Sequence, residues 1–295
     1  MPKNDIVVPM PVDSWHGPFP EPLSHQAVDA LEAGSVLFFP GLSFEIGPSD
    51  LDLLRADILG GSRKNISFDP AIGKLGNTAL AGADSARLAQ LLGTFSANAE
   101  RLVTGLLPDY AAELERARTS FRPAEIAGRS YSRRHDDRLL HIDAFPSRPM
   151  RGRRILRLFS NVAPDGAERQ WRVGEDFAAF ARQFAPRIRS SLPGNAWLQD
   201  VLGLTKGRRS PYDHVMLGLH DAGKLDRAYQ ANAPSTAVQF PAGSTWMCFT
   251  DQVLHAALAG HCALEQTFHL PVASMAHPER SPLRILESLL HRPLV

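Results

Sequence analysis

The spacing of apolar residues along the chain changes at about residue 120. Before that point, apolar residues recur every three or four positions in "SHQAVDALEAG", in "SDLDLLRADIL" and in residues 85–117, which is the spacing of a helix with one buried face. We expect a first helix capped by Ser24, and two further helices in residues 85–117 that are separated near Pro108. The stretch "SVLFFP" predicts a strand, and the six prolines of residues 1–24 predict an extended arm. Residues 1–120 are therefore predicted to form a mostly helical N-terminal elaboration.

After residue 120 the chain consists mainly of short apolar runs that are bounded by turn residues. These runs are "LLHIDAF", "RRILRLFSNV", "DHVMLGLHDA", "AVQFPAG", "TWMCFT" and "LEQTFHLPV". Short strands at close spacing are typical of a barrel or a double-sheet jelly roll. A helical insert is predicted near residues 174–203, beginning with "GEDFAAFARQF", and a C-terminal helix in residues 276–295. The prediction is an α+β fold in one domain, residues 1–295, with a double-stranded β-helix (jelly-roll) core over residues 121–275 flanked by helices.

Composition and charge narrow the class of protein. Hydrophobic residues make up 44% of the chain and charged residues 21%, so a sizeable core can be buried. The net charge of +1 gives no reason to expect a nucleic-acid partner. The two cysteines, Cys248 and Cys262, form no C-x-x-C pair, which favours a reducing compartment over a disulfide framework. The N-terminus does not resemble a signal peptide, and no apolar run approaches the roughly 20 residues of a membrane helix, so we expect a soluble, cytoplasmic protein.

The search for chemistry begins with motifs. The chain contains no G-x-x-x-x-G-K-[ST], G-x-G-x-x-G, G-x-S-x-G or H-E-x-x-H sequence, so nucleotide-binding, simple hydrolase and zincin functions gain no support. It does contain two H-x-D sequences, one starting at His135 in a charged run typical of a solvated turn, and one at His141 in an apolar run. Strand side chains alternate between faces, so His141 and Asp143 are expected to point the same way. This strand alone is compatible with two metal ligands or with a buried histidine hydrogen-bonded to its neighbour.

A third ligand is expected in "FPAGSTWMCFTDQVLHA", where His255 follows an apolar strand. The separation from Asp143 is 255 − 143 = 112 residues, long enough to close a jelly roll. Two histidines and one carboxylate from separate strands form the facial triad of non-heme Fe(II) oxygenases, which leaves positions open on the metal. Other histidines in the second half of the chain compete for this place: His214, His220, His261 and His269.

The layout "LLHIDAF … FPAGSTWMCFTDQVLHA" resembles the Fe(II)- and 2-oxoglutarate-dependent dioxygenases. More narrowly, "HIDAFPSRP", "STWMCFTDQV" and "LEQTFHLP" resemble the hydroxylases of 3-deoxy-D-manno-oct-2-ulosonic acid (Kdo), and the likeness covers most of residues 62–273. It implies His141, Asp143 and His255 as metal ligands and catalytic residues. It also implies Fe(II), 2-oxoglutarate and O₂ as cofactors, with ascorbate as an activator, and hydroxylation at C3 of Kdo in Kdo2-lipid A of the lipopolysaccharide inner core.

Three residues are candidates to hold the distal carboxylate of 2-oxoglutarate, because the chain departs from the common pattern. Many relatives in the superfamily carry an arginine about ten residues after the second histidine, whereas "AALAGHCALEQTFHLP" has no arginine or lysine and offers only the neutral Gln266. Jumonji-like relatives use a lysine two residues after a glycine on the strand following H-x-D, and Arg154 follows Gly152 in that way. Arg157 lies three residues further, on the opposite face of the strand. We take Arg154 as the first candidate, with Arg157 and Gln266 as the others.

An anionic, lipid-linked substrate calls for basic residues outside the metal site. Three clusters are available, in "SRRHDDR", "TKGRR" and "SRKN", and they would also favour peripheral contact with the cytoplasmic face of the inner membrane. Two other functions stay open at this point. One is a Jumonji-like hydroxylase of a protein or a small molecule, and the other is a jelly-roll binding module without catalysis.

Overall fold

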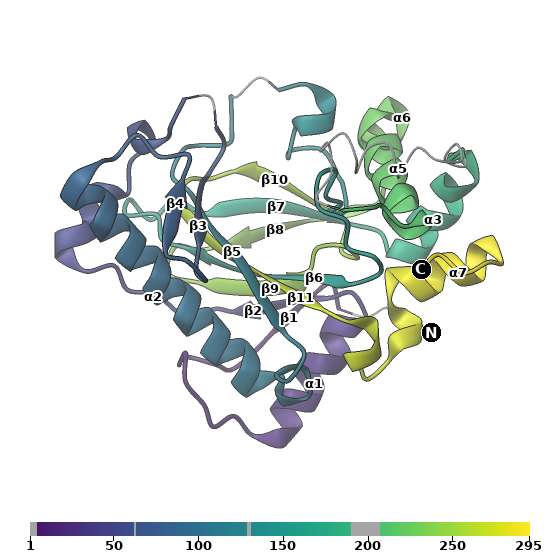
Figure 1. Ribbon diagram of the computed structural model, residues 1–295, viewed down its shortest axis with the longest axis horizontal. Helices are drawn as coiled ribbons and strands as arrows, with labels where there is room; N and C mark the ends of the chain where they lie inside the picture. Colours follow the sequence, from purple (N-terminus) through teal and green to yellow (C-terminus); the bar gives the residue numbers. More distant parts are fainter. Residues whose placement is uncertain (1–4, 62, 129–130, 190–206) are drawn as a thin grey trace.

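Two β-sheets and a set of helices make up the described chain. The computed structural model describes residues 5–61, 63–128, 131–189 and 207–295. In these residues an eight-stranded sheet has the order β1-β2-β9-β6-β11-β5-β3-β4, and a three-stranded sheet has the order β10-β7-β8 (Figure 1). All strand pairs are antiparallel except β1 with β2. The fold is thus mixed, with a large, mostly antiparallel sheet.

The large sheet contains β1 (Val7–Pro9), β2 (Val36–Phe39), β3 (Ile66–Asp69), β4 (Lys74–Gly76), β5 (Glu115–Arg122), β6 (Arg154–Asn161), β9 (Thr245–Phe249) and β11 (Ala263–Leu270). The small sheet contains β7 (Arg169–Gly174), β8 (Ser235–Phe240) and β10 (His255–Ala259). The helices are α1 (Glu21–Glu32), α2 (Gly82–Leu106), α3 (Phe177–Phe184), α5 (Pro211–Leu225), α6 (Arg227–Asn232) and α7 (Pro282–Leu290).

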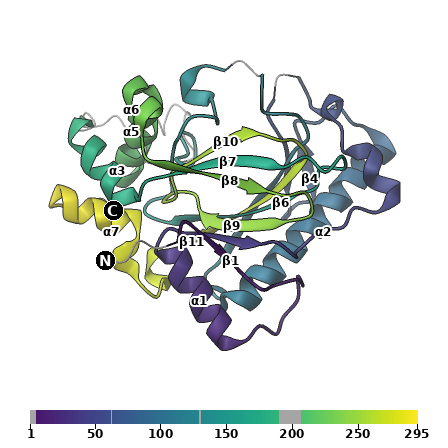
Figure 2. The ribbon, with the colours of Figure 1, turned by 180° about the vertical axis from the view of Figure 1, so that it is seen from behind.

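The helices form two groups. Helix α1 contacts β2 and β9, and α2 contacts β5 and β11, so both cover the large sheet. Helix α2 runs across the near side in Figure 1 and lies behind the strands in Figure 2. Helices α3, α5, α6 and α7 gather at one end of the strands. None of the described helices is both long enough and apolar enough to cross a membrane.

The two faces of the large sheet are buried in different surroundings. Leu156 and Leu158 of β6 belong to the core cluster that also contains the buried side chains of α1 and α2. Phe159 belongs to a second cluster, with Trp246 of β9 and with Trp171 of the small sheet. Because this second cluster draws on both sheets, it fills the space between them. Odd-numbered residues of β6 therefore point to the inner face, between the sheets, and even-numbered ones to the helix-covered face.

Strands β6, β8, β9 and β11, helix α3 and the C-terminal helix α7 lie where they are predicted, although α7 is shorter than residues 276–295. The stretch "NAWLQDVLGL", at the end of the predicted insert, lies outside the described residues.

The N-terminal part of the chain is less helical than predicted. Helices α1 and α2 are present, but strands β1 to β4 and most of β5 also fall within residues 1–120. The second helix predicted in residues 85–117 is wrong, because α2 ends at Leu106 and the chain enters β5 at Glu115. Pairing of β5 with both β3 and β11 outweighs the helical spacing of this segment. Helix α1 begins at Glu21 and buries Ser24 within it, since Pro22 suits the first turn of a helix.

Two predicted strands are also wrong. The stretch "DHVMLGLHDA" lies in helix α5, whose N-terminus is closed by a capping box between Ser210 and Asp213. Its buried residues Tyr212, Val215, Met216 and Leu219 follow helical spacing. The stretch "LLHIDAF" is an irregular segment in which only His141 forms an isolated bridge, to His255.

Candidate metal centre

Backbone hydrogen bonds bring the two histidine-bearing segments together. The amide of His141 donates to the carbonyl of His255 (3.0 Å), and the amide of His255 donates back to the carbonyl of His141 (2.9 Å). The side-chain amide of Gln230, in α6, holds both backbone groups of Leu140 at 2.9 Å. The amide of Asp143 donates to the carbonyl of Thr250 (2.8 Å). The irregular segment is thus held in place without belonging to a regular strand.

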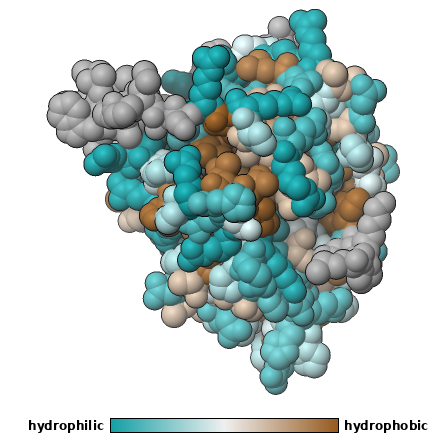
Figure 3. Space-filling model, turned by 90° about the vertical axis from the view of Figure 1, so that its right-hand side faces the viewer, coloured by the Kyte–Doolittle hydropathy of each residue, from teal (hydrophilic) through white to brown (hydrophobic). Residues whose placement is uncertain are grey.

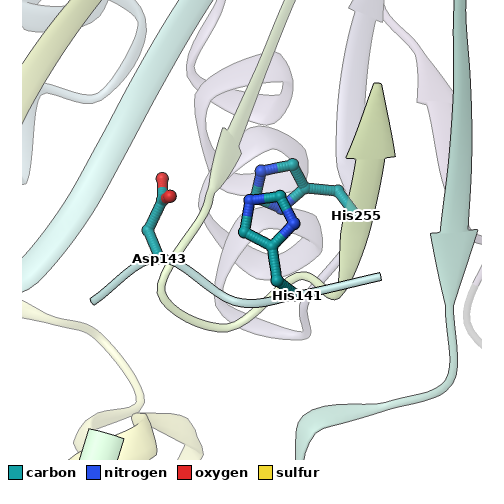
Figure 4. Close-up of side chains that lie close together, drawn as sticks. All are labelled: His141, Asp143 and His255. Atoms are coloured by element: carbon teal, nitrogen blue, oxygen red, sulfur yellow. The ribbon is translucent and has the colours of Figure 1, made fainter. Parts of the chain in front are cut away.

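His141, Asp143 and His255 converge as a result (Figure 4). One ligand atom from each lies within 4.8 Å of the others, and no other group of three such side chains is found among the described residues. The Nδ1 atom of His141 lies 2.7 Å from the carbonyl of Leu139, and that of His255 lies 2.9 Å from the carbonyl of Val253. Because a carbonyl only accepts, both Nδ1 atoms carry the proton, and each Nε2 lone pair is free to bind a metal.

The charge states suit a cation. Burial, helped by the neighbouring His255 and Lys224, lowers the pKa of His141, and burial is also the main cause of the lowered pKa of His255. Burial acts to raise the pKa of Asp143, but lowering interactions, of which the charge of Arg157 is the largest, hold that pKa well below its usual range. Two neutral imidazoles and one carboxylate therefore face one another near neutral pH, the protonation states that metal binding requires.

One observation tests the fit of a metal directly. The Oδ2 atom of Asp143 is buried and accepts no hydrogen bond, although Arg157 lies within ion-pair distance at 3.2 Å. A buried carboxylate oxygen without a hydrogen bond is costly unless a cation satisfies it. Two imidazole nitrogens and one carboxylate oxygen, open on one side, match the ligand set of Fe(II) oxygenases. The three residues fit a divalent iron ion.

The other H-x-D sequence does not join this group. His135 is exposed and its Nδ1 atom lies 2.8 Å from Ser132 Oγ. Asp137 is ion-paired with Lys64 (3.0 Å) and Arg122 (3.6 Å). The interpretation of His135 as part of a solvated turn agrees with this placement.

Comparison with known proteins identifies the family. The sequence profile described as 3-deoxy-D-manno-oct-2-ulosonic acid (Kdo) hydroxylase matches residues 15–293. The chain belongs to the Kdo hydroxylase family. A crystal structure of the Kdo hydroxylase KdoO, a non-heme Fe(II) alphaketoglutarate dependent dioxygenase in complex with alphaketoglutarate and Fe(III), is 45% identical, with a TM-score of 0.95 over 99% of this chain and 98% of that one. A cobalt(II) complex of KdoO is 46% identical, with a TM-score of 0.96 over the same shares. A search of curated protein sequences gives no match.

The three candidates for the co-substrate carboxylate lie in different places in this Kdo hydroxylase. Arg154 points to the helix-covered face, where its Nε donates to Asp251 (2.8 Å), its Nη2 donates to Gln252 (2.6 Å) and its side chain is fully buried. Gln266, on the same face, donates to the carbonyls of Ala117 and Thr267 and accepts from Thr119. Only Arg157 points to the inner face. Its Nη1 lies 3.2 Å from Asp143.

Three cations in the interior of this family member were missed from sequence, two of them buried and one, Arg122, partly exposed. Arg169 of β7 is 4% exposed, and burial lowers its pKa to about 9. Arg122 of β5 is ion-paired with Glu265 (3.1 Å), and Lys224 of α5 is 1% exposed. A signal for Arg169 was available, because it alternates in phase with the apolar Trp171 and Val173 of the same strand.

Proposed function

We propose that this chain is an Fe(II)- and 2-oxoglutarate-dependent dioxygenase that hydroxylates C3 of the Kdo sugar in Kdo2-lipid A of the lipopolysaccharide inner core. The observation that carries the proposal is the group of His141, Asp143 and His255, with both Nε2 atoms free and a carboxylate oxygen without a hydrogen bond. These three side chains would hold the iron. Family membership supplies the sugar that is hydroxylated.

When bound, iron supplies a site where 2-oxoglutarate and O₂ react, so that decarboxylation to succinate and CO₂ is coupled to insertion of one oxygen atom into a C–H bond. The chain contributes orientation and exclusion of water. The carbonyls of Leu139 and Val253 fix the rotation of the two imidazoles. The ring of Trp171 stacks on His255, with centroids 5.1 Å apart, and shields it from solvent.

Arg157 is our choice to bind a carboxylate of 2-oxoglutarate, in place of Arg154. Its side chain is 12% exposed, its Nε is buried without a hydrogen-bond partner, and its Nη1 is shared between Asp143 and Glu265 at 3.2 Å each. An arginine with unused donors on its planar fork suits a carboxylate. The guanidinium of Arg154, by contrast, is already satisfied by Asp251 and Gln252.

Other donors on the inner face also lack partners. Arg169 Nε and Trp171 Nε1 are buried without a hydrogen bond in the described part of the chain. Trp246 Nε1 of the inner aromatic cluster and Arg157 Nε are unpartnered as well, so at least four N–H groups of the described residues are unsatisfied between the sheets, and a buried donor without an acceptor is costly. A dicarboxylate such as 2-oxoglutarate supplies only acceptors, so its chemistry complements this interior.

We further propose that the two sheets form a double-stranded β-helix and that residues 1–295 act as one catalytic domain. Support comes from the inner aromatic cluster, in which Phe159 of the large sheet lies 5.1 Å from Trp171 of the small sheet between ring centroids. The N-terminal strand β2 pairs with β9, so the first part of the chain extends the same sheet that carries Arg157.

A lipid-linked substrate leads us to propose peripheral contact with the cytoplasmic face of the inner membrane. The side of the molecule where α5 and α7 lie has a patch of hydrophobic side chains surrounded by hydrophilic ones (Figure 3). Leu225, the last residue of α5, is 43% exposed, and the C-terminal Val295 is 61% exposed. Co-sedimentation with vesicles that contain anionic lipids should retain the protein at low salt, and no binding at any salt concentration would contradict this contact.

The experiment that tests the function compares the wild type with His255→Ala and His135→Ala. We expect His255→Ala to lose bound iron and to lower succinate formation and Kdo hydroxylation by at least about 100-fold, since even changes beyond the direct ligands commonly cost 10–100-fold. His135→Ala, in the other H-x-D sequence, should keep both. Normal iron binding by His255→Ala would show that the ligand assignment is wrong.

The substrate is tested in the same assay. Wild-type enzyme should convert a Kdo-containing glycolipid to a product with one more oxygen atom, matched by succinate. Hydroxylation of peptides but not of the glycolipid would point to a Jumonji-like protein hydroxylase. Iron binding without succinate formation under any condition would point to a binding module.

A further inference from the structure

Lys224 is a buried lysine with few partners. It lies in the last turn of α5, where a lysine ordinarily keeps its ammonium in water beside the helix carbonyls, yet it is 1% exposed. Its Nζ donates to the carbonyl of Arg134 at 3.2 Å. No carboxylate of the described residues lies within ion-pair distance of it. An ammonium has three donors, and burying it without a counter-charge is expensive.

Lys224 is also close to the metal centre. It lies one helical turn after His220, so the two side chains share a face of α5. The ring of His220 stands edge-on to His141, with centroids 5.7 Å apart. The charge of Lys224 contributes to the lowered pKa values of both His141 and His255, and burial lowers the pKa of Lys224 itself. These relations place an incompletely satisfied cation next to the ligand group without making it a ligand.

A second cation lies beside it. The Nε of Arg133 donates to the backbone carbonyl of Lys224 at 3.2 Å, while the Nη2 of Arg133 is buried without a partner. The acidic groups around this corner are already paired: Asp137 with Lys64 and Arg122, and Asp221 of α5 with Arg134 (2.9 Å). The corner between α5 and the segment that carries Arg133 therefore has unused N–H donors and no free carboxylate among the described residues.

We propose that Lys224 binds the carboxylate of the Kdo sugar and thereby sets the carbon that is hydroxylated. The inference rests on the proposed function. In 3-deoxy-D-manno-oct-2-ulosonic acid the carboxyl carbon C1 is bonded to C2, and C2 is bonded to C3, the target. The carboxylate must therefore lie close to the iron without binding it, which requires a cation adjacent to the ligand group. Lys224, from α5, is such a cation, and it is separate from Arg157 of β6, which serves 2-oxoglutarate.

A purely structural role for Lys224 would be to brace the carbonyl of Arg134. The variant Lys224→Gln separates the two roles, because glutamine keeps a hydrogen-bond donor for that carbonyl but has no charge. Lys224→Arg keeps the charge. Arg187→Gln is the matched control: it removes one positive charge from an exposed arginine that is ion-paired with Asp226, two residues after Lys224.

The experiment measures kcat/KM for a Kdo-containing glycolipid and for its C1 carboxamide, with each variant. Because the proposed hydrogen bond is charge-assisted, Lys224→Gln should lower kcat/KM for the acid by about 10- to 100-fold. With the carboxamide the same variant should lose less than about threefold, because the charge it removes has no partner there. The KM for 2-oxoglutarate should change less than about twofold, Lys224→Arg should recover part of the loss, and Arg187→Gln should match the wild type.

Equal losses of Lys224→Gln with acid and carboxamide would overturn the proposal, as would a raised KM for 2-oxoglutarate. If Lys224→Gln does not fold, Lys224→Arg and the wild type still decide the question. If the wild type has the same kcat/KM for the acid and the carboxamide, no cation of the enzyme binds the carboxylate. In that case the assignment of Lys224 fails, but the proposed function does not. A wild type that hydroxylates neither compound, yet forms succinate with another substrate, removes the proposed function and the assignment with it.

Discussion

Arg154 and Arg157 lie three residues apart on β6, and their surroundings differ completely. On the helix-covered face, Arg154 is fully buried, its guanidinium lies 3.9 Å from the ring centroid of Phe249, and it has a complete set of partners in Asp251 and Gln252. On the inner face, Arg157 shares one nitrogen between two carboxylates and leaves its buried Nε unused. A satisfied buried cation stabilises the packing around it, whereas an incompletely satisfied one is available to a ligand.

The largest effect is expected on the helix-covered face. Arg154→Ala should lower the free energy of unfolding by about 3–5 kcal/mol, because it leaves the buried carboxylate of Asp251 unpaired. Chemical denaturation measures the change. The paired variant Arg154→Met with Asp251→Leu should recover most of it, since replacing both members of a buried pair by apolar groups is often neutral. A loss that the second substitution does not recover would mean that Arg154 acts by packing alone.

On the inner face, the expected effect of a substitution is on the affinity for 2-oxoglutarate. Arg157→Ala is expected to weaken 2-oxoglutarate binding by about 10- to 100-fold, the contribution of a charge-assisted hydrogen bond. Calorimetric titration of the iron-loaded protein measures this affinity. Arg153→Ala, which removes an arginine next to the same strand that is ion-paired with Glu115 at the surface, is the control and should bind 2-oxoglutarate normally. Unchanged binding by Arg157→Ala would rule out its proposed role.

A titratable group on the inner face gives a smaller, pH-dependent effect. His269 of β11 is nearly buried, its Nε2 has no hydrogen-bond partner in the described chain, and burial lowers its pKa to about 4 despite Glu115 at 3.7 Å. In the unfolded chain His269 has a pKa of about 6.5, so as the pH falls it is protonated there before it is protonated in the folded protein. Stability is therefore complete above about pH 6.5 and falls toward pH 4, by about 2 kcal/mol between pH 7 and pH 5.

His269→Gln should flatten the slope of unfolding free energy against pH in that window, as measured by urea denaturation at several pH values. The lowered pKa of Glu115 also makes the protein less stable in acid. That loss occurs mainly at pH values below the usual pKa of a glutamate, so it is distinguished from the effect of His269 by its pH range. An unchanged slope between pH 7 and pH 5 would show that His269 is not the group responsible.

The smallest change is expected at the exposed ion pair between Glu115 and Arg153. Glu115→Gln breaks the ion pair with Arg153, whose partners are 49% and 35% exposed, and should alter the free energy of unfolding at neutral pH by no more than about 1 kcal/mol. A thermal or urea unfolding curve is sufficient to detect a larger effect. Such an effect would indicate that the pair supports the burial of His269.

Much of the site was predictable because its signals are local. Short apolar runs bounded by turn residues identified β6, β9 and β11, and an H-x-D pair followed by His255 identified the three ligand candidates. The prediction that Arg154 and Arg157 point to opposite faces also follows from strand geometry alone. Family likeness of the quoted motifs indicated the Kdo hydroxylases, and the profile match confirms it.

One error occurs where distant contacts decide the outcome. The second helix predicted in residues 85–117 does not form, because two neighbouring strands offer hydrogen bonds to the chain from Glu115 onward and it enters β5. The error at "DHVMLGLHDA" has a local cause instead: its composition is strand-like, but the capping box at Ser210 starts a helix. That helix in turn buries Lys224 beside the metal centre, which no local pattern indicates.

The sequence by itself therefore determined the ligand types, their spacing and the strands near them, since these depend on side-chain chemistry and on a two-residue period. Only the tertiary structure decided which face of β6 meets the metal ligands. Two faces of one strand are equivalent until a second sheet packs on one of them and helices on the other. That packing makes Arg154 a member of the core. It leaves the Nε of Arg157, three residues away, without a hydrogen-bond partner and therefore available to a ligand.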